Sequence, residues 1–422
     1  MSTPGAAAPP PSAALPLWRQ REYMLLWSGQ LTTNVGAQAS GIIYPILILA
    51  LTSSPVQASW ATALRMVPYL VLSLPVGALI DRWDRRRVML VCHAARFVAV
   101  ASVPLAMAFD VLTIAQIYVV AILEGALHVF FNIAETAALP RVVAPGQLPQ
   151  ATAQNQAGFA SAAIVGPAVG SWLYQAVGRG FPFVVDAASH LFGGIAVWKL
   201  RTSFAPARDR KPRPLRDEVA EGMRWLWQQR VVRDMALVTS VLNGINAALP
   251  LLLIVLAQER QASEAQIGLV FSLGGVGAIV GALLGGVIAR RLSFGHAILL
   301  SVGVRAICIP LLLLCPGPWT LGAVYALASL FGPLYDVVQF SYRIALIPDT
   351  LQGRVNSSFR LFAFLLNPVG AAACGWLLEH GGSTWTTAFF GALCVLLALA
   401  VRWDPAIRNA VHPHTRVHEV EA

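Results

Sequence analysis

Twelve apolar segments, each long enough to cross a lipid bilayer, constrain this chain more than any other feature. They lie at about residues 23–51, 57–80, 88–109, 112–138, 151–176, 181–200, 234–257, 266–289, 296–315, 319–346, 357–378 and 384–403. A helix of about 20 apolar residues spans the hydrocarbon core of a membrane. Only 12% of the 422 residues are charged, which is about half the share in a soluble domain. The sequence predicts an all-α integral membrane protein with twelve transmembrane helices.

The charges between these segments predict the orientation, because loops that remain in the cytoplasm carry an excess of Lys and Arg. Every second link is basic: Arg82, Arg85, Arg86 and Arg87, then Arg141, the run from Arg201 to Arg233, Arg290 and Arg291, and finally Arg343 and Arg354. The other links contain only Arg179 and Arg260. Both termini are therefore predicted to be cytoplasmic. The net charge of +10 is spread over these links instead of one continuous basic face, so no nucleic-acid partner is expected.

An internal repeat predicts two halves of six helices each. The interval from Asn155 to Pro167 recurs from Asn356 to Pro368, and each is followed by a Gly-rich stretch and Trp-Leu. Parallel six-helix halves are one of the known transporter architectures. We expect halves at residues 17–200 and 234–404, and a cytoplasmic linker at 201–233 whose second part is an amphipathic helix. Residues 1–16 are expected to be a disordered cytoplasmic tail, and residues 405–422 a second cytoplasmic tail.

Motifs for enzymatic chemistry are absent from the sequence. It contains no phosphate-binding Gly-x-x-x-x-Gly-Lys-Ser/Thr loop, no His-Glu-x-x-His pair and no Cys-x-x-Cys pair. Neither a cofactor nor a metal site is expected, and the chain is not expected to be an enzyme. An ion or substrate gradient is the expected energy source.

Polar side chains recur at helical spacing inside four of the apolar segments. These stripes comprise Gln30, Asn34 and Gln38; Glu124, His128, Asn132 and Glu135; Asn243 and Asn246; and Asp336, Gln339 and Arg343. Residues three or four positions apart lie on one face of a helix. Each set is therefore a candidate lining for a substrate cavity.

Ionisable groups at membrane depth are costly and mark a transport pathway by default. Glu124 lies about 12 residues into its segment, which at about 1.5 Å per residue puts it near the bilayer midplane. Glu124 and Asp336 are the candidates for proton coupling, and His128, one helical turn from Glu124, could relay the proton. Alternatively, Glu124 pairs with Arg65 or Arg96 and only ties helices together. For Asp186 and His190, an interhelical bond is expected in place of coupling.

The stretch from Gly77 to Arg87, with Asp81 and Arg82 inside it, resembles a signature of the major facilitator superfamily. Four further stretches resemble the branch of bacterial exporters that includes the enterobactin exporter and macrolide-efflux proteins. They are residues 130–140, 166–170, 221–225 and 348–357. Together the resemblance covers about residues 17–404.

The resemblance implies roles for several residues. Gly77, Asp81, Arg82, Arg85 and Arg86 would form a conformational latch, in which an acid at a helix end pairs with a neighbouring helix in one state only. A second set, Gly166, Pro167 and Gly170, resembles the helix-five motif of antiporters. The helices that carry the polar stripes would line the central path.

Two departures from the family pattern bear on coupling. Many relatives have Gly-Asp where this chain has Gly36 and Ala37, and Ile122 stands where many antiporters have Arg. Proton coupling therefore does not follow from the motifs alone.

These features predict a secondary active transporter in the bacterial plasma (inner) membrane. It would export an amphipathic small molecule, of drug or siderophore type, by proton antiport and alternating access, and would work as a monomer in the bilayer. The alternatives are a metabolite importer or uniporter of the same fold, and a transport-inactive membrane sensor or scaffold.

Overall fold

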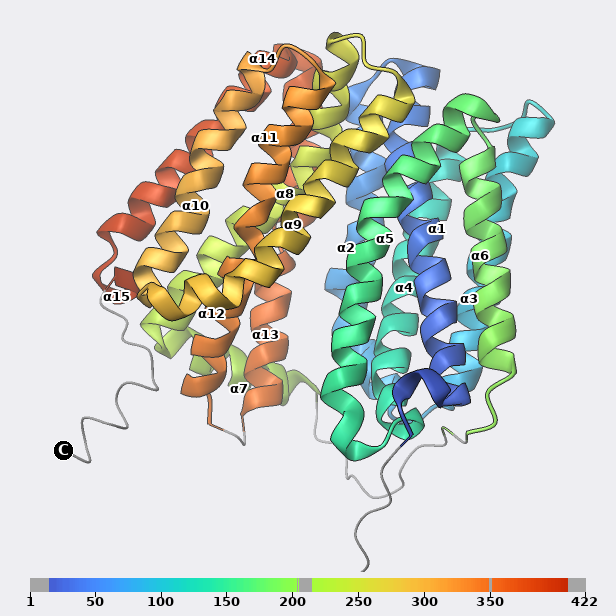
Figure 1. Cartoon of the computed structure of the whole chain (residues 1–422), viewed down its shortest axis with the longest axis horizontal. Coiled ribbons are helices and arrows are strands. Elements are labelled where there is room, and N and C mark those ends of the chain that lie inside the picture. The colour runs from blue at the N-terminus through green and yellow to red at the C-terminus, as the bar shows by residue number, and fades with distance from the viewer. Residues whose placement is uncertain (1–14, 203, 205–214, 349–350, 409–422) are drawn as a thin grey trace, which may run out of the picture.

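The computed structural model describes residues 15–202, 204, 215–348 and 351–408, and every regular element in this part is a helix (Figure 1). The helices of 18 residues or more are α1 (Arg21–Thr52), α2 (Pro55–Ile80), α3 (Arg85–Ala108), α4 (Ile114–Val142), α5 (Leu148–Ala176), α6 (Phe181–Trp198), α8 (Arg230–Glu259), α9 (Glu264–Arg291), α10 (Phe294–Leu311) and α14 (Asn367–Trp403). The shorter ones are η1 (Leu17–Arg19), η2 (Pro145–Gln147), α7 (Leu215–Gln228), η3 (Leu312–Leu314), α11 (Pro318–Leu330), α12 (Gly332–Leu346), α13 (Gln352–Phe364) and α15 (Pro405–Arg408).

Within the described residues, ten helical segments are long and apolar enough to cross a membrane. The pairs α11–α12 and α13–α14 each count as one of these segments, and α2 is not among them. The chain is thus an all-helical protein with many candidate membrane spans, as expected. The predicted number of twelve is not reached by this measure.

Side chains that cap helices mark where several of the spans begin. The Ser54 hydroxyl accepts a hydrogen bond from the Gln57 N–H at the start of α2, and Asp84 and Thr113 cap α3 and α4 in the same way. Such caps satisfy N–H groups that have no partner inside the helix. The short polar links between apolar runs therefore set the helix boundaries.

Breaks divide the later helices more often than the sequence analysis expects. Residues 319–346, expected as one helix, form α11 and α12, which meet at Phe331 ahead of Pro333. The next expected helix is also broken, between α13 and α14, just before Pro368. Proline supplies no N–H to the preceding turn and clashes with it. Within α14, Gly382 has φ 73°, a left-handed conformation that glycine adopts without strain.

The helices form two groups that lie side by side (Figure 1). In the first helix group, α1–α6, α1 packs on α5 and α6, and α4 packs on α2 and α3. In the second helix group, α8–α14, α8 and α10 pack on α14, and α9 packs on α11. The short helix α7 contacts α13 and α8. The tails were predicted at 1–16 and 405–422. Of these, residues 1–14 and 409–422 lie outside the described residues, as do 203 and 205–214 of the predicted linker.

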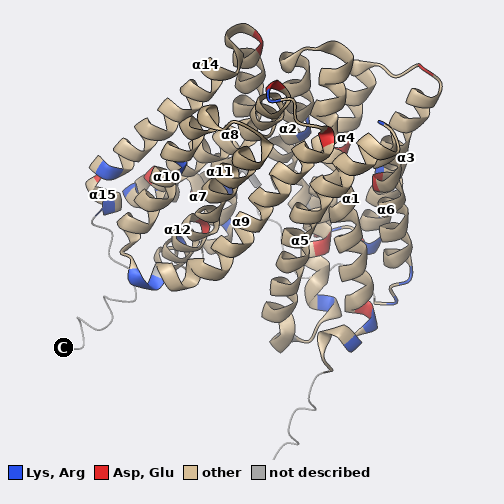
Figure 2. Ribbon diagram, turned by 45° about the horizontal axis from the view of Figure 1, so that its top comes forward, with Lys and Arg blue, Asp and Glu red and all other residues tan. Residues whose placement is uncertain are grey.

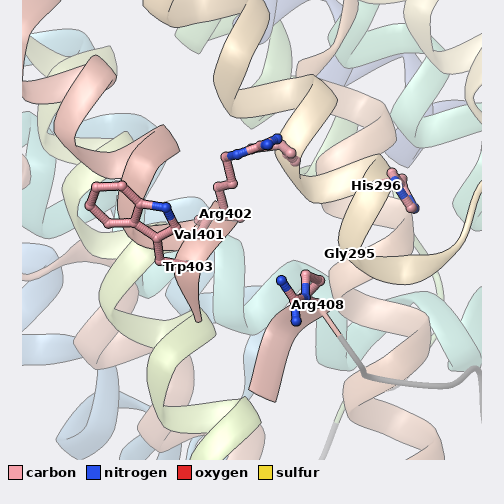
Figure 3. Close-up of a pocket in the computed structure, with 7 residues that line it drawn as sticks. Gly295, His296, Val401, Arg402, Trp403 and Arg408 are labelled. Atoms are coloured by element: carbon pink, nitrogen blue, oxygen red, sulfur yellow. The ribbon is translucent and has the colours of Figure 1, made fainter. Parts of the chain in front are cut away.

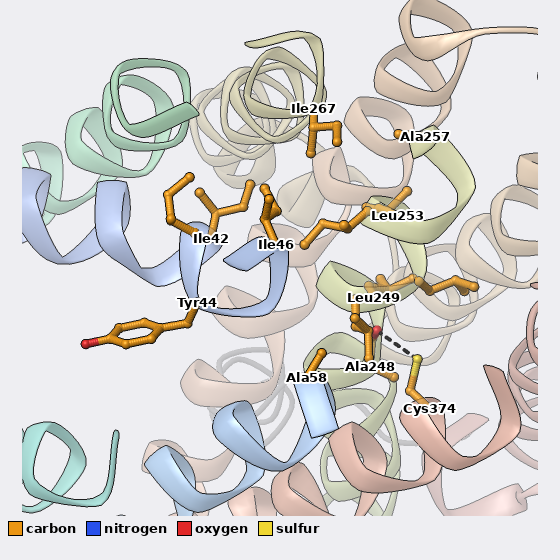
Figure 4. Close-up of a cluster of buried hydrophobic side chains, with 14 of the residues drawn as sticks. Ile42, Tyr44, Ile46, Ala58, Ala248, Leu249, Leu253, Ala257, Ile267 and Cys374 are labelled. Carbon is orange, nitrogen blue, oxygen red and sulfur yellow. Dashed lines mark hydrogen bonds between the residues drawn. The ribbon is translucent and has the colours of Figure 1, made fainter. Parts of the chain in front are cut away.

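A shared hydrophobic core joins the two groups near the C-terminal ends of α1 and α8 (Figure 4). Ile42 and Ile46 of α1 belong to the same buried cluster as Leu249 and Leu253 of α8. The cluster also takes in Cys374 of α14, whose S–H donates to the Ala248 carbonyl at 3.3 Å. We name this end of the molecule the closed end, because apolar side chains from both groups seal it.

Polar contacts reinforce the closed end. The Glu379 carboxylate of α14 accepts hydrogen bonds from the Ser54 hydroxyl (2.5 Å) and the Val56 N–H (3.0 Å) of the first group. Similarly, α5 and α9 approach closely, since a Cβ at Gly268 would lie 2.5 Å from the Pro167 carbonyl oxygen. Small residues permit such close helix contacts.

The opposite end carries most of the basic links, and we name it the basic end. Lys and Arg gather at the lower end of both helix groups in Figure 2. It includes the link between α2 and α3, with Arg82 and Arg87 exposed.

Candidate functional site

A buried ionic cluster lies inside the first helix group. The side chains of Glu124 on α4 and Asp186 on α6 are both 0% exposed. Oε1 of Glu124 lies 3.8 Å from a guanidinium nitrogen of Arg96 on α3. The Asp186 carboxylate accepts a hydrogen bond from the Ser40 hydroxyl of α1 at 2.6 Å, and lies 3.5 Å from Nε2 of His190. Arg65 of α2 interacts electrostatically with both acids.

Two glycines allow these helices to meet. A Cβ at Gly36 of α1 would lie 2.8 Å from Oδ1 of Asp186, and a Cβ at Gly125 of α4 would lie 3.0 Å from the Arg65 carbonyl carbon. The close approach at Gly36 thus brings Asp186 of α6 against α1.

The cluster balances its own charge. Glu124 and Asp186 face the two cations Arg65 and Arg96, so the four groups are neutral together. Among the described residues, both carboxylate oxygens of Glu124 and both ring nitrogens of His190 have no hydrogen-bond partner. Atoms of Glu124, Asp186 and His190 lie within 4.8 Å of one another, close enough for a metal ion. Two neighbouring arginines would leave such an ion uncompensated in a medium of low polarity, so the cluster is a poor site for a metal ion.

A cavity of about 450 Å³ opens in the second helix group, on the side of the basic end. Its walls come from α8, α12 and α13: Thr239, Asn243, Asp336, Val337, Gln339, Phe340, Arg343, Phe359, Arg360, Ala363 and Phe364. Aromatic rings alternate with amides, two arginines and one acid. This mixture is typical of sites for small organic ligands.

Stacked rings hold the arginines of the cavity. The Arg343 guanidinium lies 3.8 Å from the ring centre of Phe359 and 5.5 Å from that of Phe340. Arg360 donates a hydrogen bond to the Tyr69 hydroxyl of α2 at 2.6 Å. The Tyr69 ring in turn packs edge-on against Phe364. The first helix group therefore touches the rim of the cavity.

Asp336 is the exposed acid of this cavity. It interacts electrostatically with Arg305 of α10, whose guanidinium donates to the Asn246 side-chain oxygen at 2.8 Å. A Cβ at Gly332 would lie 3.0 Å from Arg305, so the glycine at the α11–α12 break leaves room for this arginine. In contrast to Glu124, the Asp336 side chain is exposed at the wall of the cavity.

The structure brings some of the predicted cavity residues together and leaves others apart. Gln30 donates to the Glu135 carboxylate at 2.9 Å, which joins the stripes of α1 and α4. Asn243 donates to the Ala363 carbonyl at 3.0 Å. Gln38 packs against α5 at Gly166. The remaining predicted residues of the first group have these positions: His128 is exposed and within electrostatic reach of Arg65 and Arg96, Asn132 is exposed, and Asn34 is half-buried.

The residues of the predicted latch lie at the basic end. Arg85 donates to the Ala137 carbonyl of α4 at 3.1 Å, and Arg86 donates to the Val197 carbonyl of α6 at 3.3 Å. Asp81 and Arg82 are exposed, and neither side chain makes a hydrogen bond or an ion pair to the described residues. No atom lies within 4 Å of a Cβ at Gly77. Arg85 and Arg86 thus bind the loop to the first group. The carboxylate of Asp81 stays available for the pairing that the predicted latch requires.

The helix-five motif packs against α1. A Cβ at Gly166 would lie 3.1 Å from the Ala39 N, and a Cβ at Gly170 would lie 2.7 Å from the Ala39 Cα. Pro167 lies inside α5. The motif therefore has a packing role within the first group, which does not conflict with a role in transport.

Several charged residues of the two sites were not singled out in the sequence analysis. Arg65 and Arg96 appeared there only as alternative partners of Glu124. Arg305, Arg360 and His93, whose ring centre lies 5.8 Å from that of His190, did not appear at all. All five are ionisable residues inside apolar segments, which is the signal that identified Glu124. Applying that rule to cations as well as acids would have found them.

A second cavity, of about 300 Å³, lies at the surface where α10, α14 and α15 meet (Figure 3). Its charged lining comprises His296, Arg402 and Arg408, and the ring of Trp403 stands beside them. None of the predicted site residues contributes to it.

Comparison with known proteins identifies the family. The Major Facilitator Superfamily matches residues 26–256 and again residues 235–417. The chain belongs to the Major Facilitator Superfamily. It is 26% identical over 396 residues to a protein named multidrug efflux pump Tap from Mycolicibacterium fortuitum, covering 92% of this chain and 96% of that one. It is also 26% identical over 338 residues to the enterobactin exporter EntS of Escherichia coli O1:K1 / APEC, covering 80% of both. The resemblance to this superfamily and to its bacterial exporters is thereby confirmed.

Solved structures of the superfamily share the fold. A bacterial homologue of the iron transporter ferroportin, in an inward-facing state, matches 90% of this chain and 98% of its own with a TM-score of 0.73 at 14% identity. A variant of the nucleoside transporter NupG matches 90% of this chain and 99% of its own with a TM-score of 0.76 at 11% identity. The chain is a multi-pass membrane protein of a transporter family.

Proposed function

We propose that this chain is a proton-driven exporter of amphipathic small molecules of drug or siderophore type. The observation that carries the proposal is the combination of the closed end with the cavity on the side of the basic end. Alternating access requires a central site that is sealed from one face while it opens to the other. Similarity to Tap and EntS over most of the chain supports export over import.

We infer twelve membrane crossings, the ten candidate spans with two additions. The additions are helix α2, which is 26 residues long, and a division of α14 at the non-helical Gly382. An even number of crossings would leave both termini on one face, and the arginines of the basic end support the cytoplasm of a bacterial inner membrane as that face. The two halves would comprise residues 17–200 and 234–404, and the cavity would face inward in this conformation.

Protons would reach the two halves differently. Asp336 faces the cavity, so protonation from the cytoplasmic side would neutralise it and release the interaction with Arg305. Glu124 is sealed, and His128 beside it is the group through which a proton could enter. A proton bound in only one conformation biases the equilibrium between the two conformations, and that bias is the physical basis of antiport.

The proposal is tested in proteoliposomes that contain the pH dye pyranine. A panel of macrolides, tetracyclines and siderophores is added, and proton movement is followed together with movement of the compound. We expect at least one compound to move against a proton flux, and both fluxes to fall to background in Asp336→Asn and Glu124→Gln.

Two alternatives give different results in the same assay. A uniporter would move the compound at the same rate with and without a pH gradient, and an importer would accumulate it in the direction of the protons. A sensor or scaffold would bind compounds without moving them. Any of these results would contradict proton-driven export.

A further inference from the structure

The cavity of the second helix group contains a buried cation whose hydrogen bonds are incomplete. Arg343 is only 5% exposed, and its Nε and Nη1 have no hydrogen-bond partner among the residues that the structure describes. Arginine stays charged in proteins, and a buried charge without a partner is strongly unfavourable. A ligand with a negative group would supply what Arg343 lacks.

The stacking geometry leaves the donors of Arg343 available. Phe359 lies against the face of the guanidinium, 3.8 Å from its centre, and Phe340 lies 5.5 Å away. Rings on the face of the group satisfy it through cation–π attraction but accept none of its in-plane N–H bonds. A guanidinium held in this way presents a planar edge that matches a carboxylate with two parallel hydrogen bonds.

The net charge of the cavity also favours a negatively charged ligand. Arg360 lies within electrostatic reach of Arg343, and its hydrogen bond goes to the neutral Tyr69 hydroxyl. Among the described residues that line the cavity, Asp336 is the only acid, and it interacts with Arg305. Two lining arginines therefore face one acid, which already has a cation of its own. Charges in a poorly polar site act strongly on one another, so the excess favours an anion.

The walls determine the rest of the ligand. Phe340, Phe359 and Phe364 offer rings to a flat apolar body, while Asn243 and Gln339 offer amides at its edge. From these contacts we propose that the cavity binds acidic aromatic compounds, with Arg343 as the partner of their carboxylate or phenolate group. The inference rests on the proposed transport function and specifies the class of its substrate.

Orientation in the membrane does not account for this arginine. An arginine that serves only to hold a loop in the cytoplasm needs contact with water and headgroups. Arg82 and Arg87 of the α2–α3 link are exposed in that way, whereas Arg343 is buried between rings.

Three probes with one ring system test the proposal: 2-naphthoate, 2-naphthamide and 2-naphthylmethylammonium. Their binding to the purified full-length protein is measured by isothermal titration calorimetry. We expect naphthoate to bind about tenfold or more tightly than the amide, as one charge-assisted interaction allows, and the cation to bind most weakly. Absence of naphthoate binding, equal binding of the three probes or a preference for the cation would overturn the proposal.

Variants locate the interaction. Arg343→Gln should remove the preference for naphthoate, and Arg343→Lys should keep part of it, because the charge remains while the planar fork is lost. Arg402→Gln, in the second cavity, is the matched control and should bind as the unmodified protein does. If Arg343→Gln kept the preference, the assignment would be wrong. Thermal melting without ligand shows which variants are folded, and Arg343→Lys serves if the glutamine variant is not.

Binding needs no gradient, so this outcome is separable from that of the transport assay. Naphthoate binding without proton-driven flux would leave the cavity assignment intact and overturn the antiport. Proton-driven flux of compounds without an acidic group, together with no naphthoate binding, would overturn the cavity assignment and leave the antiport intact.

Discussion

The two helix groups differ in how the charges inside them are compensated. In the first group, Glu124 and Asp186 meet two arginines in a sealed cluster that is neutral as a whole. In the second group, Arg343, Arg360 and Asp336 line a cavity and leave an excess of positive charge. The buried charges of the first group compensate one another, whereas positive charge is left on the cavity wall of the second group.

Breaking the sealed cluster should have the largest effect. Arg96→Leu leaves Glu124 buried with one cation fewer, and loss of one partner of a buried ion pair costs about 3–5 kcal/mol. The free energy of unfolding is measured by chemical denaturation in detergent. Adding Glu124→Leu should restore a large part of the loss. Arg305→Leu is the control from the second group, and a loss there as great as in Arg96→Leu would contradict the comparison.

Separating the helices around the cluster should have the next largest effect. Gly36→Leu puts a side chain where Asp186 and Ser189 already lie, and overpacking of this kind costs about 1–3 kcal/mol. The change is read from the melting temperature of the purified protein. Gly303→Leu on α10 is the control, because nothing lies within 4 Å of a Cβ there. Equal melting temperatures for the two variants would refute the packing argument.

The contacts at the closed end should contribute less. Glu379→Gln weakens the bonds from Ser54 and Val56, which shifts the balance toward the conformation open at that end. Spin labels at Arg82 and Gly353, both exposed, report the separation of the two groups at the basic end. The population with a shorter distance should grow in Glu379→Gln. An unchanged distance distribution would show that these bonds do not hold the end closed.

Asp336 should give the smallest change in stability and a complete loss of coupling. It is exposed in the cavity, and substitutions at such positions usually stay within about 0.5 kcal/mol. Asp336→Asn should therefore melt like the unmodified protein while proton flux in proteoliposomes disappears. A pH-dependent flux that persists in this variant would move the coupling role to the first helix group.

Much of the fold was predictable because its signals are local. The apolar runs correspond closely to the helices, since spanning length is a property of a single segment. The breaks at Phe331 and before Pro368 were missed although prolines mark both. A proline is common within membrane helices, and only its neighbours decide whether the helix bends or ends there.

The site was predictable in part, and for a physical reason. Helical spacing placed Asp336, Gln339 and Arg343 on one helix, and all three line the cavity. Spacing also placed Asn34 and Asn132 in stripes, but these side chains make no hydrogen bond to the described residues. Periodicity fixes which residues share a face and leaves open which way that face turns.

The sequence alone determined the family, the apolar spans and the basic links, because each depends on residues close together in the chain. The tertiary structure decided which charges meet. Asp186 on α6 reaches Glu124 on α4 only because Gly36 and Gly125 let four helices converge. Nε and Nη1 of Arg343 have no hydrogen-bond partner among the described residues, because the rings of Phe340 and Phe359 lie against the guanidinium. These contacts depend on how the helices rotate and pack against one another, which the sequence of a single segment does not determine.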